Sequence, residues 1–173
     1  MRLLIDRLVD ARIGQTVNFY RDGVDAALRR DRLAAYLEAH AGAELLLVGE
    51  APGYRGARVS GVPFTSERQL TGTGPAEATA TIVHRVLTTL GVEEQVLLWN
   101  VVPTHPGTAT SNRTPTRTEV TQGRVFADEL AAGRRVLAVG RVAHAALGGV
   151  YVRHPSHGGA AEFDRSLRAL IGA

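Results

Sequence analysis

The chain has 173 residues, of which 45% are hydrophobic, so it is long enough to form one domain with a core of its own. It contains no cysteine, which excludes disulfides, thiolate metal sites and cysteine-ligated iron–sulfur clusters. The formal net charge of +3 rests on 20 basic residues that are all arginine, which is compatible with a polyanionic partner and excludes a lysine Schiff base.

Residues 1–43 are predicted to form a helical segment with polar faces that packs on the rest of the domain. Leu28, Leu33 and Leu37 recur at helical spacing between residues 25 and 39, and Gly42 ends that pattern. The apolar run at the start of the chain is short and interrupted by charges, unlike a signal peptide. No run approaches the ~20 apolar residues that cross a bilayer. We therefore expect a cytoplasmic protein with no membrane partner.

Four short apolar runs predict strands, at residues 44–49, 95–100, 135–140 and 150–153. Because the runs are continuous rather than alternating, we expect strands that are buried on both faces of a parallel sheet. Helical patterns lie between and after them, at residues 77–90, 117–132, 142–147 and 161–171. This alternation predicts a single α/β domain over residues 1–173. The segment 104–116, rich in Thr, Pro, Gly and Asn, reads as a long loop, and such loops are usually functional or disordered.

Ligands of such sheets bind at the carboxyl ends of the strands. Gly49-Glu50-Ala51-Pro52-Gly53 follows the first predicted strand, and Asn100 ends the second. His154-Pro155-Ser156-His157 follows the last strand and precedes two glycines. We expect these polar, turn-forming stretches to converge on one crevice.

Five motifs in this order resemble those of the uracil-DNA glycosylase superfamily, and of its family 4 in particular. They are Gly49-Glu50-Ala51-Pro52-Gly53, Val62-Pro63-Phe64, Asn100, Asn112-Arg113-Thr114-Pro115 and His154-Pro155-Ser156. The resemblance covers about residues 44–171. It implies a three-layer α/β/α sandwich around a central, mostly parallel four-stranded sheet. It also implies an enzyme of base excision repair that hydrolyses the N-glycosidic bond of a flipped-out deoxyuridine.

The resemblance assigns the base pocket and its chemistry to Gly49, Glu50, Ala51, Phe64, Asn100 and His154. Phe64 would stack on the flipped ring, and Asn100 would read the N3–H and O4 of uracil. His154 would donate to O2 as negative charge develops on the departing base, and Glu50 would orient water or stabilise the sugar. Each has a structural alternative: a core phenylalanine, a turn asparagine, a structural histidine and a capping or turn carboxylate.

Contacts to DNA phosphates are assigned by position to Arg113, Ser156, His157 and the backbone near Gly158. In relatives, the residues that match His157-Gly158-Gly159 insert a side chain into the gap left by the flipped base. Because glycine is a poor wedge, we expect a preference for uracil in single-stranded or mismatched DNA. The partner is therefore DNA, at the bacterial nucleoid. We expect a monomer that needs no cofactor and no metal.

The departures from the family are equally specific. The cysteines that hold the family 4 cluster are absent, which implies a cluster-free relative. Ala51 stands where family 1 has a water-activating aspartate, so Glu50 is the remaining acid. Gly53 stands where family 1 has a tyrosine that excludes thymine, which implies a more open pocket beside C5 of the base. Residues 54–62 contain no histidine that could trap the abasic sugar, and the chain has no lysine for strand cleavage, so the enzyme would be monofunctional.

Two alternatives remain beside uracil excision. One is a glycosylase for another deaminated base, hypoxanthine or xanthine. The other is a non-catalytic module that binds uracil or abasic sites in DNA. A generic nucleotide-binding protein is disfavoured, because no strand is followed by a G-x-G-x-x-G or GK[ST] loop. The histidines outside the His-Pro-Ser motif are predicted to be surface or helix residues; they are His40, His84, His105, His144 and His157.

Overall fold

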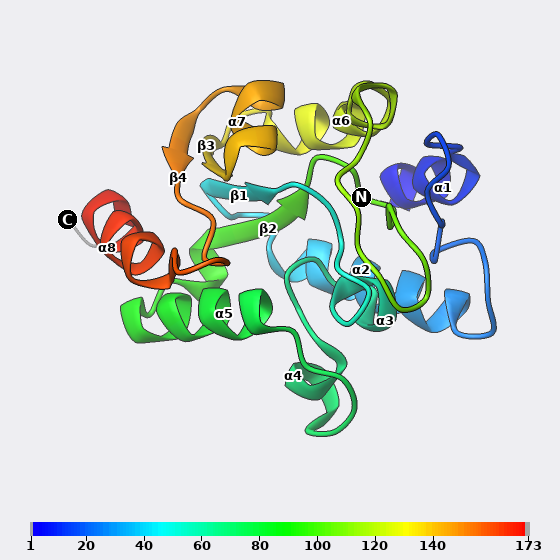
Figure 1. Ribbon diagram of the computed structural model, residues 1–173, viewed down its shortest axis with the longest axis horizontal. Helices are drawn as coiled ribbons and strands as arrows, with labels where there is room; N and C mark the ends of the chain where they lie inside the picture. The colour runs from blue at the N-terminus through cyan, green and yellow to red at the C-terminus, as the bar shows by residue number, and fades with distance from the viewer. Residues whose placement is uncertain (1, 172–173) are drawn as a thin grey trace.

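The computed structural model describes residues 2–171 and is built on a four-stranded sheet (Figure 1). Met1, Gly172 and Ala173 of the predicted domain lie outside the described residues. The strands are β1 (Leu45–Gly49), β2 (Val96–Asn100), β3 (Arg135–Val139) and β4 (Val150–Val152). Their order is β2-β1-β3-β4 and every pair is parallel, which confirms the predicted sheet.

Helices cover both faces of this sheet. They are α1 (Arg2–Asp10), α2 (Ala26–Ala39), α3 (Ala57–Ser60), α4 (Glu67–Thr71), α5 (Ala78–Leu90), α6 (Arg117–Ala131), α7 (Arg141–Leu147) and α8 (Ala160–Ile171), with a 3₁₀ turn η1 (Glu93–Gln95) before β2. Figure 1 shows α5 and α8 below the sheet and α6 and α7 above it. Within the described residues, no helix is both long and apolar enough to cross a membrane.

Alternate residues of β1, β2 and β3 enter two separate cores, whereas β4 contributes only Val152. Leu47 and Leu137 pack with residues of α5 and α8, whereas Leu46 and Leu97 pack with α1, α2, α6 and α7. Both faces of β1, β2 and β3 are therefore apolar, which explains the continuous runs in the sequence. The predicted bounds of the strands and of the helices α2, α5, α6, α7 and α8 agree with the structure to within one residue.

The segment before the sheet is only partly helical. Leu8 of α1 and Leu33 of α2 are fully buried in the same core as β1. Residues 11–25 between the two helices are irregular instead. Asn18 replaces the missing regular hydrogen bonds, because its buried side-chain amide donates to the carbonyls of Leu8, Val9 and Ala11.

The long loop 104–116 is anchored by His105, which is fully buried. The backbones of Val17 and His105 exchange hydrogen bonds of 2.9 and 3.0 Å. Nδ1 of the His105 ring lies 2.8 Å from the carbonyl oxygen of Pro52, and Nε2 lies 2.9 Å from that of Thr108. The prediction of a surface or helix position for His105 is therefore wrong. The loop is buried only at residues 104–106 and at Pro115, and there the imidazole nitrogens lie within hydrogen-bonding distance of two backbone carbonyls.

Glu119 joins the same loop to the N-terminal segment. It begins α6 through a capping box, in which its carboxylate accepts from the backbone N–H of Thr116 and its own N–H donates to the Thr116 hydroxyl. The carboxylate also accepts two hydrogen bonds from Arg113, at 2.6 and 2.7 Å, and one from the backbone N–H of Gln15. The Arg113 guanidinium is the main cause that lowers the pKa of Glu119 to about 2.

We predict that Glu119→Gln lowers the free energy of unfolding by about 1–3 kcal/mol, because buried donors lose a charged acceptor. Urea unfolding at pH 7 measures the change. Since the pKa of Glu119 is lower in the fold than in the unfolded chain, its contribution is present above pH 4.5 and fades as the pH falls toward 2. The difference between wild type and variant should therefore shrink in acid.

The matched control is Asp128→Asn, which removes the carboxylate of the exposed i,i+4 pair between Arg124 and Asp128. Its effect should stay below about 0.5 kcal/mol. Equal effects of the two substitutions at pH 7 would contradict a structural role for Glu119.

Candidate active site

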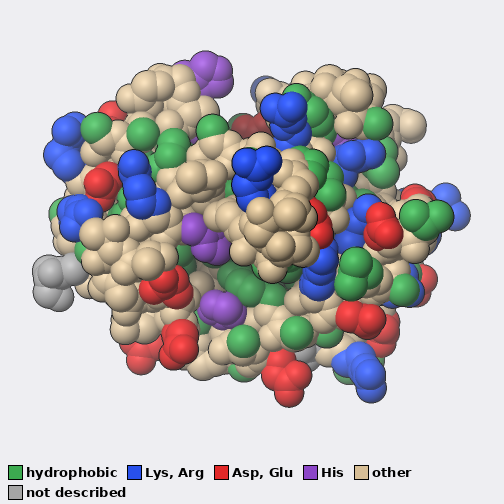
Figure 2. Space-filling view, turned by 90° about the horizontal axis from the view of Figure 1, so that it is seen from below, with side chains coloured by type: hydrophobic (Ala, Val, Ile, Leu, Met, Phe, Trp, Pro, Cys, Tyr) green, Lys and Arg blue, Asp and Glu red, His purple; other side chains and the backbone are tan. Residues whose placement is uncertain are grey.

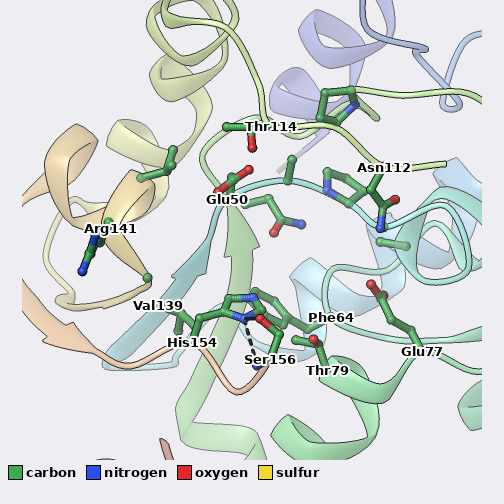
Figure 3. A pocket seen from close by; sticks show the side chains of 18 of the residues that line it. Glu50, Phe64, Glu77, Thr79, Asn112, Thr114, Val139, Arg141, His154 and Ser156 are labelled. Carbon is green, nitrogen blue, oxygen red and sulfur yellow. Dashed lines mark hydrogen bonds between the residues drawn. The ribbon is translucent and has the colours of Figure 1, made fainter. Parts of the chain in front are cut away.

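A cavity of about 800 Å³ opens at the carboxyl ends of the strands (Figure 3). The stretches that follow β1, β2 and β4 all reach it, through Glu50, Asn100 and His154. The loop 104–116 and the start of α7 complete its walls. The convergence expected from the strand ends is therefore observed.

Phe64 forms one wall of the cavity and also packs in the core. Its backbone is left-handed, with φ of 53°, which is rare for a residue other than glycine. The ring lies so close to Gly49 that a Cβ at this position would collide with it. Phe64 is thus both a core residue and part of the cavity wall, since the residue is 8% exposed and lines the cavity. Its stacking on a base stays a prediction.

Asn100 has a buried carboxamide with unused hydrogen-bonding capacity. Seven other buried polar side chains all have hydrogen-bond partners: Asn18, Ser60, Thr65, Ser66, Thr104, His105 and Glu119. Among the described residues, the indole N–H of Trp99 is also buried without a partner, but Trp99 does not line the cavity. The Asn100 side chain forms no hydrogen bond within this part of the chain, although the residue is only 5% exposed. Because buried polar groups are normally paired, a free amide that lines a cavity points to a ligand.

His154 is oriented by the two residues that follow Pro155. The backbone N–H of Ser156 donates to Nδ1 of His154 at 3.1 Å. The Ser156 hydroxyl lies 2.7 Å from the same nitrogen and 2.9 Å from Nδ1 of His157. A backbone N–H can only donate, so Nδ1 of His154 is an acceptor and its proton is on Nε2. Burial, followed by the charges of His157 and Arg153, lowers the pKa of His154 and favours this neutral form.

Glu50 is half-buried at the cavity wall, directly after β1. No residue of the described chain forms an ion pair or a hydrogen bond with its carboxyl group. Burial therefore raises the pKa of Glu50, since no partner offsets the loss of solvation. A carboxylate without a cation beside it remains available to a positive charge or a water molecule in the cavity.

Of the residues predicted to contact DNA, some line the cavity and one does not. Ser156 and His157 line the cavity, whereas Gly158 is not among its lining residues and has open space where a Cβ would stand. Arg113 lines the cavity too, but its guanidinium is paired with Glu119. Its contact with phosphate stays a prediction. Ala51 lines the cavity as expected.

Sequence reasoning missed several residues of the cavity, among them Glu77, Thr79, Arg141 and Arg153. Glu77 reads in the sequence as the first residue of a helix, and it is indeed the N-cap of α5. Its carboxyl group lies where a Cβ at Gly53 or Gly56 would be. The expectation of an open pocket beside Gly53 is therefore wrong, because Glu77 fills that space.

The profile of the family described as "Uracil DNA glycosylase superfamily" matches residues 38–170, about three quarters of the chain. The chain belongs to this superfamily. Membership of the uracil DNA glycosylase superfamily indicates a DNA glycosylase, a hydrolase that acts on DNA. A search among curated proteins finds no match.

A solved structure supports the same fold. The chain is similar to the wild-type SMUG2 of Pedobacter heparinus, with a TM-score of 0.66 over 98% of this chain and 99% of that one. The two sequences are 13% identical, so this likeness bears on the fold alone. It agrees with the three-layer α/β/α sandwich that the superfamily resemblance implies. Among residues 2–171, no three His, Asp or Glu side chains cluster closely enough to hold a metal ion.

We predict that His154 is neutral, with its proton on Nε2, at pH 6.5, the ordinary pKa of an imidazole. Long-range ¹H–¹⁵N correlation spectra distinguish the two tautomers. Ser156→Ala should keep the same tautomer, because the backbone N–H still donates to Nδ1. A proton on Nδ1, or a titration midpoint at or above 6.5, would contradict the assignment.

Proposed function

We propose that this protein is a monofunctional DNA glycosylase that hydrolyses the N-glycosidic bond of a flipped-out deoxyuridine and leaves an abasic site. The observation that carries the proposal is the free carboxamide of Asn100, which shares one cavity with the Phe64 ring and with Nε2 of His154. Family membership supports the reaction class. The base is inferred from the side chains of the cavity.

The amide of Asn100 matches one edge of uracil. Its oxygen can accept from N3–H, and its nitrogen can donate to O4. Cytosine presents the opposite pattern at these two atoms and would leave the buried amide unpaired, at a cost of about 1–3 kcal/mol for each group. Phe64 offers a face for stacking, which is worth about 1–3 kcal/mol for a base on an aromatic ring.

His154 acts on the leaving base. As the bond to the sugar breaks, negative charge spreads onto uracil, and a donor already aimed at O2 stabilises it. The neutral ring suffices, because the departing anion needs a hydrogen bond rather than a full proton. Ser156 holds the ring in place by accepting from His157 and donating to Nδ1 of His154, the one arrangement that agrees with the Ser156 backbone contact.

Glu50 serves the sugar side of the reaction. Its carboxylate would stabilise the positive charge that develops on the sugar or orient the attacking water, as carboxylates do in glycoside hydrolysis. Either task requires the ionised form. Within residues 2–171 no cation forms an ion pair with Glu50, which leaves its charge available for this task.

The proposed partner is uracil-containing DNA, single-stranded or mismatched. The face seen in Figure 2 carries arginine and histidine side chains around a central hollow, with acidic side chains among them. Arg141 and Arg153 line the cavity, and Arg141 forms no ion pair within the described residues. Such side chains suit phosphate contacts. The open backbone at Gly158 supports the preference for bases that are already unstacked. We also propose a monomer in the cytoplasm.

A glycosylase for hypoxanthine or xanthine is the second candidate. The N1–H and O6 of hypoxanthine repeat the donor and acceptor that uracil presents at N3 and O4, so the Asn100 amide would pair with either base. A binding module without catalysis remains the third possibility, and the first assay below separates all three.

We predict that the wild-type protein excises uracil from a labelled oligonucleotide and that the strand breaks only after alkali. His154→Ala should lower the rate about 10²–10³-fold, because one preorganised donor is lost. Asn100→Ala should lower kcat/KM for the uracil-containing oligonucleotide, because the amide that pairs with the base is lost. His144→Ala, at an exposed histidine outside the cavity, should leave the rate unchanged.

The same assay compares single-stranded uracil with U·A and U·G duplexes, and we expect U·A to be slowest. Excision of hypoxanthine or xanthine but not uracil would establish the second candidate. Binding without excision at stoichiometric protein would establish the third. Strand breakage without alkali would contradict a monofunctional enzyme.

We predict that activity falls in acid because Glu50 must be ionised. Burial raises the pKa of Glu50 above its ordinary value of 4.5, so the rate should begin to fall at a pH above that value. Single-turnover rates between pH 4.5 and 8 measure the profile. Glu50→Gln should be about 10²-fold slower at neutral pH and should lack this acid limb. A wild-type rate in Glu50→Gln would remove Glu50 from the mechanism.

A further inference from the structure

The cavity contains a second carboxyl group that the proposed mechanism does not use. Glu77 precedes α5, and its backbone N–H donates to the Ser66 hydroxyl at 2.9 Å. Its side chain lies against Gly53 and Gly56 of the turn after β1. A Cβ at either glycine would collide with the carboxyl oxygens, one oxygen for each glycine. The two glycines therefore make the space that this carboxyl group occupies.

The contacts of Glu77 do not explain why a carboxyl group is there. It forms no hydrogen bond or ion pair with any side chain of residues 2–171, and it does not cap α5. Its surroundings disfavour the charge, since burial raises its pKa. Glu77 is partly buried and lines the cavity, so its unpaired carboxyl group is available to whatever fills that cavity.

The geometry of a bound pyrimidine indicates which atom Glu77 faces. In uracil, C2 and C5 lie at opposite corners of the ring. His154 is proposed to hold O2, and O2 is attached to C2. Figure 3 shows Glu77 across the cavity from His154, with Phe64 and Thr79 between them. A base that stacks on Phe64 with O2 at His154 therefore directs C5 toward Glu77.

We infer that Glu77 is a specificity-determining residue, whose carboxyl group forms the wall beside C5 of the bound base and excludes thymine. This inference rests on the proposed function. When uracil is bound, the hydrogen at C5 is small enough to leave the carboxyl group of Glu77 open to the rest of the cavity. The C5 methyl group of thymine would cover the carboxyl group of Glu77 and offer it no hydrogen bond. Covering a polar group without a hydrogen-bond partner is unfavourable. The wall thus rejects thymine by polarity as well as by size.

Glu77→Ala removes the wall without removing a helix cap, because the carboxyl group makes no capping hydrogen bond. We predict that this variant loses at least about tenfold of the preference for uracil over thymine, the lower end of what one carbon is worth in a fitted pocket. Excision from single-stranded oligonucleotides with uracil or thymine at the same site measures the ratio. Glu77→Gln keeps the shape and should retain most of the preference. Glu94→Gln, an exposed acid outside the cavity, is the matched control.

Binding separates this inference from the proposed function. In a His154→Ala background, fluorescence anisotropy gives Kd for the same two oligonucleotides with and without Glu77→Ala. If the wild-type protein excises neither base, the proposed function fails, while the binding ratio still tests Glu77. A loss of the uracil preference in Glu77→Ala supports the wall. An unchanged ratio in folded Glu77→Ala, or a parallel loss for both bases, overturns it.

Discussion

The cavity depends on one close approach, in which the Phe64 ring lies against the backbone of Gly49. The end of β1 can carry no side chain here, because a Cβ would collide with the ring and would also be tight against the amide oxygen of Asn100. The parallel register places Gly49 opposite Asn100. An aromatic face and a free amide therefore stand side by side at the edge of the sheet, and the left-handed backbone of Phe64 is the conformational cost of bringing the ring there.

The buried polar groups of the scaffold differ from those of the cavity in whether they have hydrogen-bond partners. Scaffold groups such as Asn18, His105 and Glu119 are buried with their hydrogen bonds satisfied. In the cavity, the Asn100 amide and the carboxyl group of Glu50 have no protein partner in the described residues, and Nε2 of His154 is equally free. The scaffold thereby fixes the positions of groups whose own bonding capacity is kept for a ligand, which is the arrangement that electrostatic preorganisation requires.

The fold was predictable from the sequence because its strands are buried on both faces, and this produces apolar runs that alternate with helical patterns. The same regularity located Glu50, Asn100 and His154, since each ends a strand or lies within two residues of its end. Glu77 and His105 were not predictable. Their roles depend on contacts with Gly53 and Pro52, which tertiary packing brings to them from more than twenty positions away. A glycine that makes room for a distant carboxyl group cannot be distinguished in sequence from a glycine in a turn.

The shared carboxylate of Glu119 joins two stretches that lie about a hundred residues apart. It accepts from Gln15 and from Arg113, and Gly14 has no room for a side chain beside it. The backbones of Val17 and His105 are also hydrogen-bonded to each other. These contacts together hold the irregular segment 11–25 against the loop 104–116. Substitutions in residues 14–17 would then reach the cavity wall although none of them touches the base. In divergent members of the superfamily that keep this arrangement, the two stretches should coevolve.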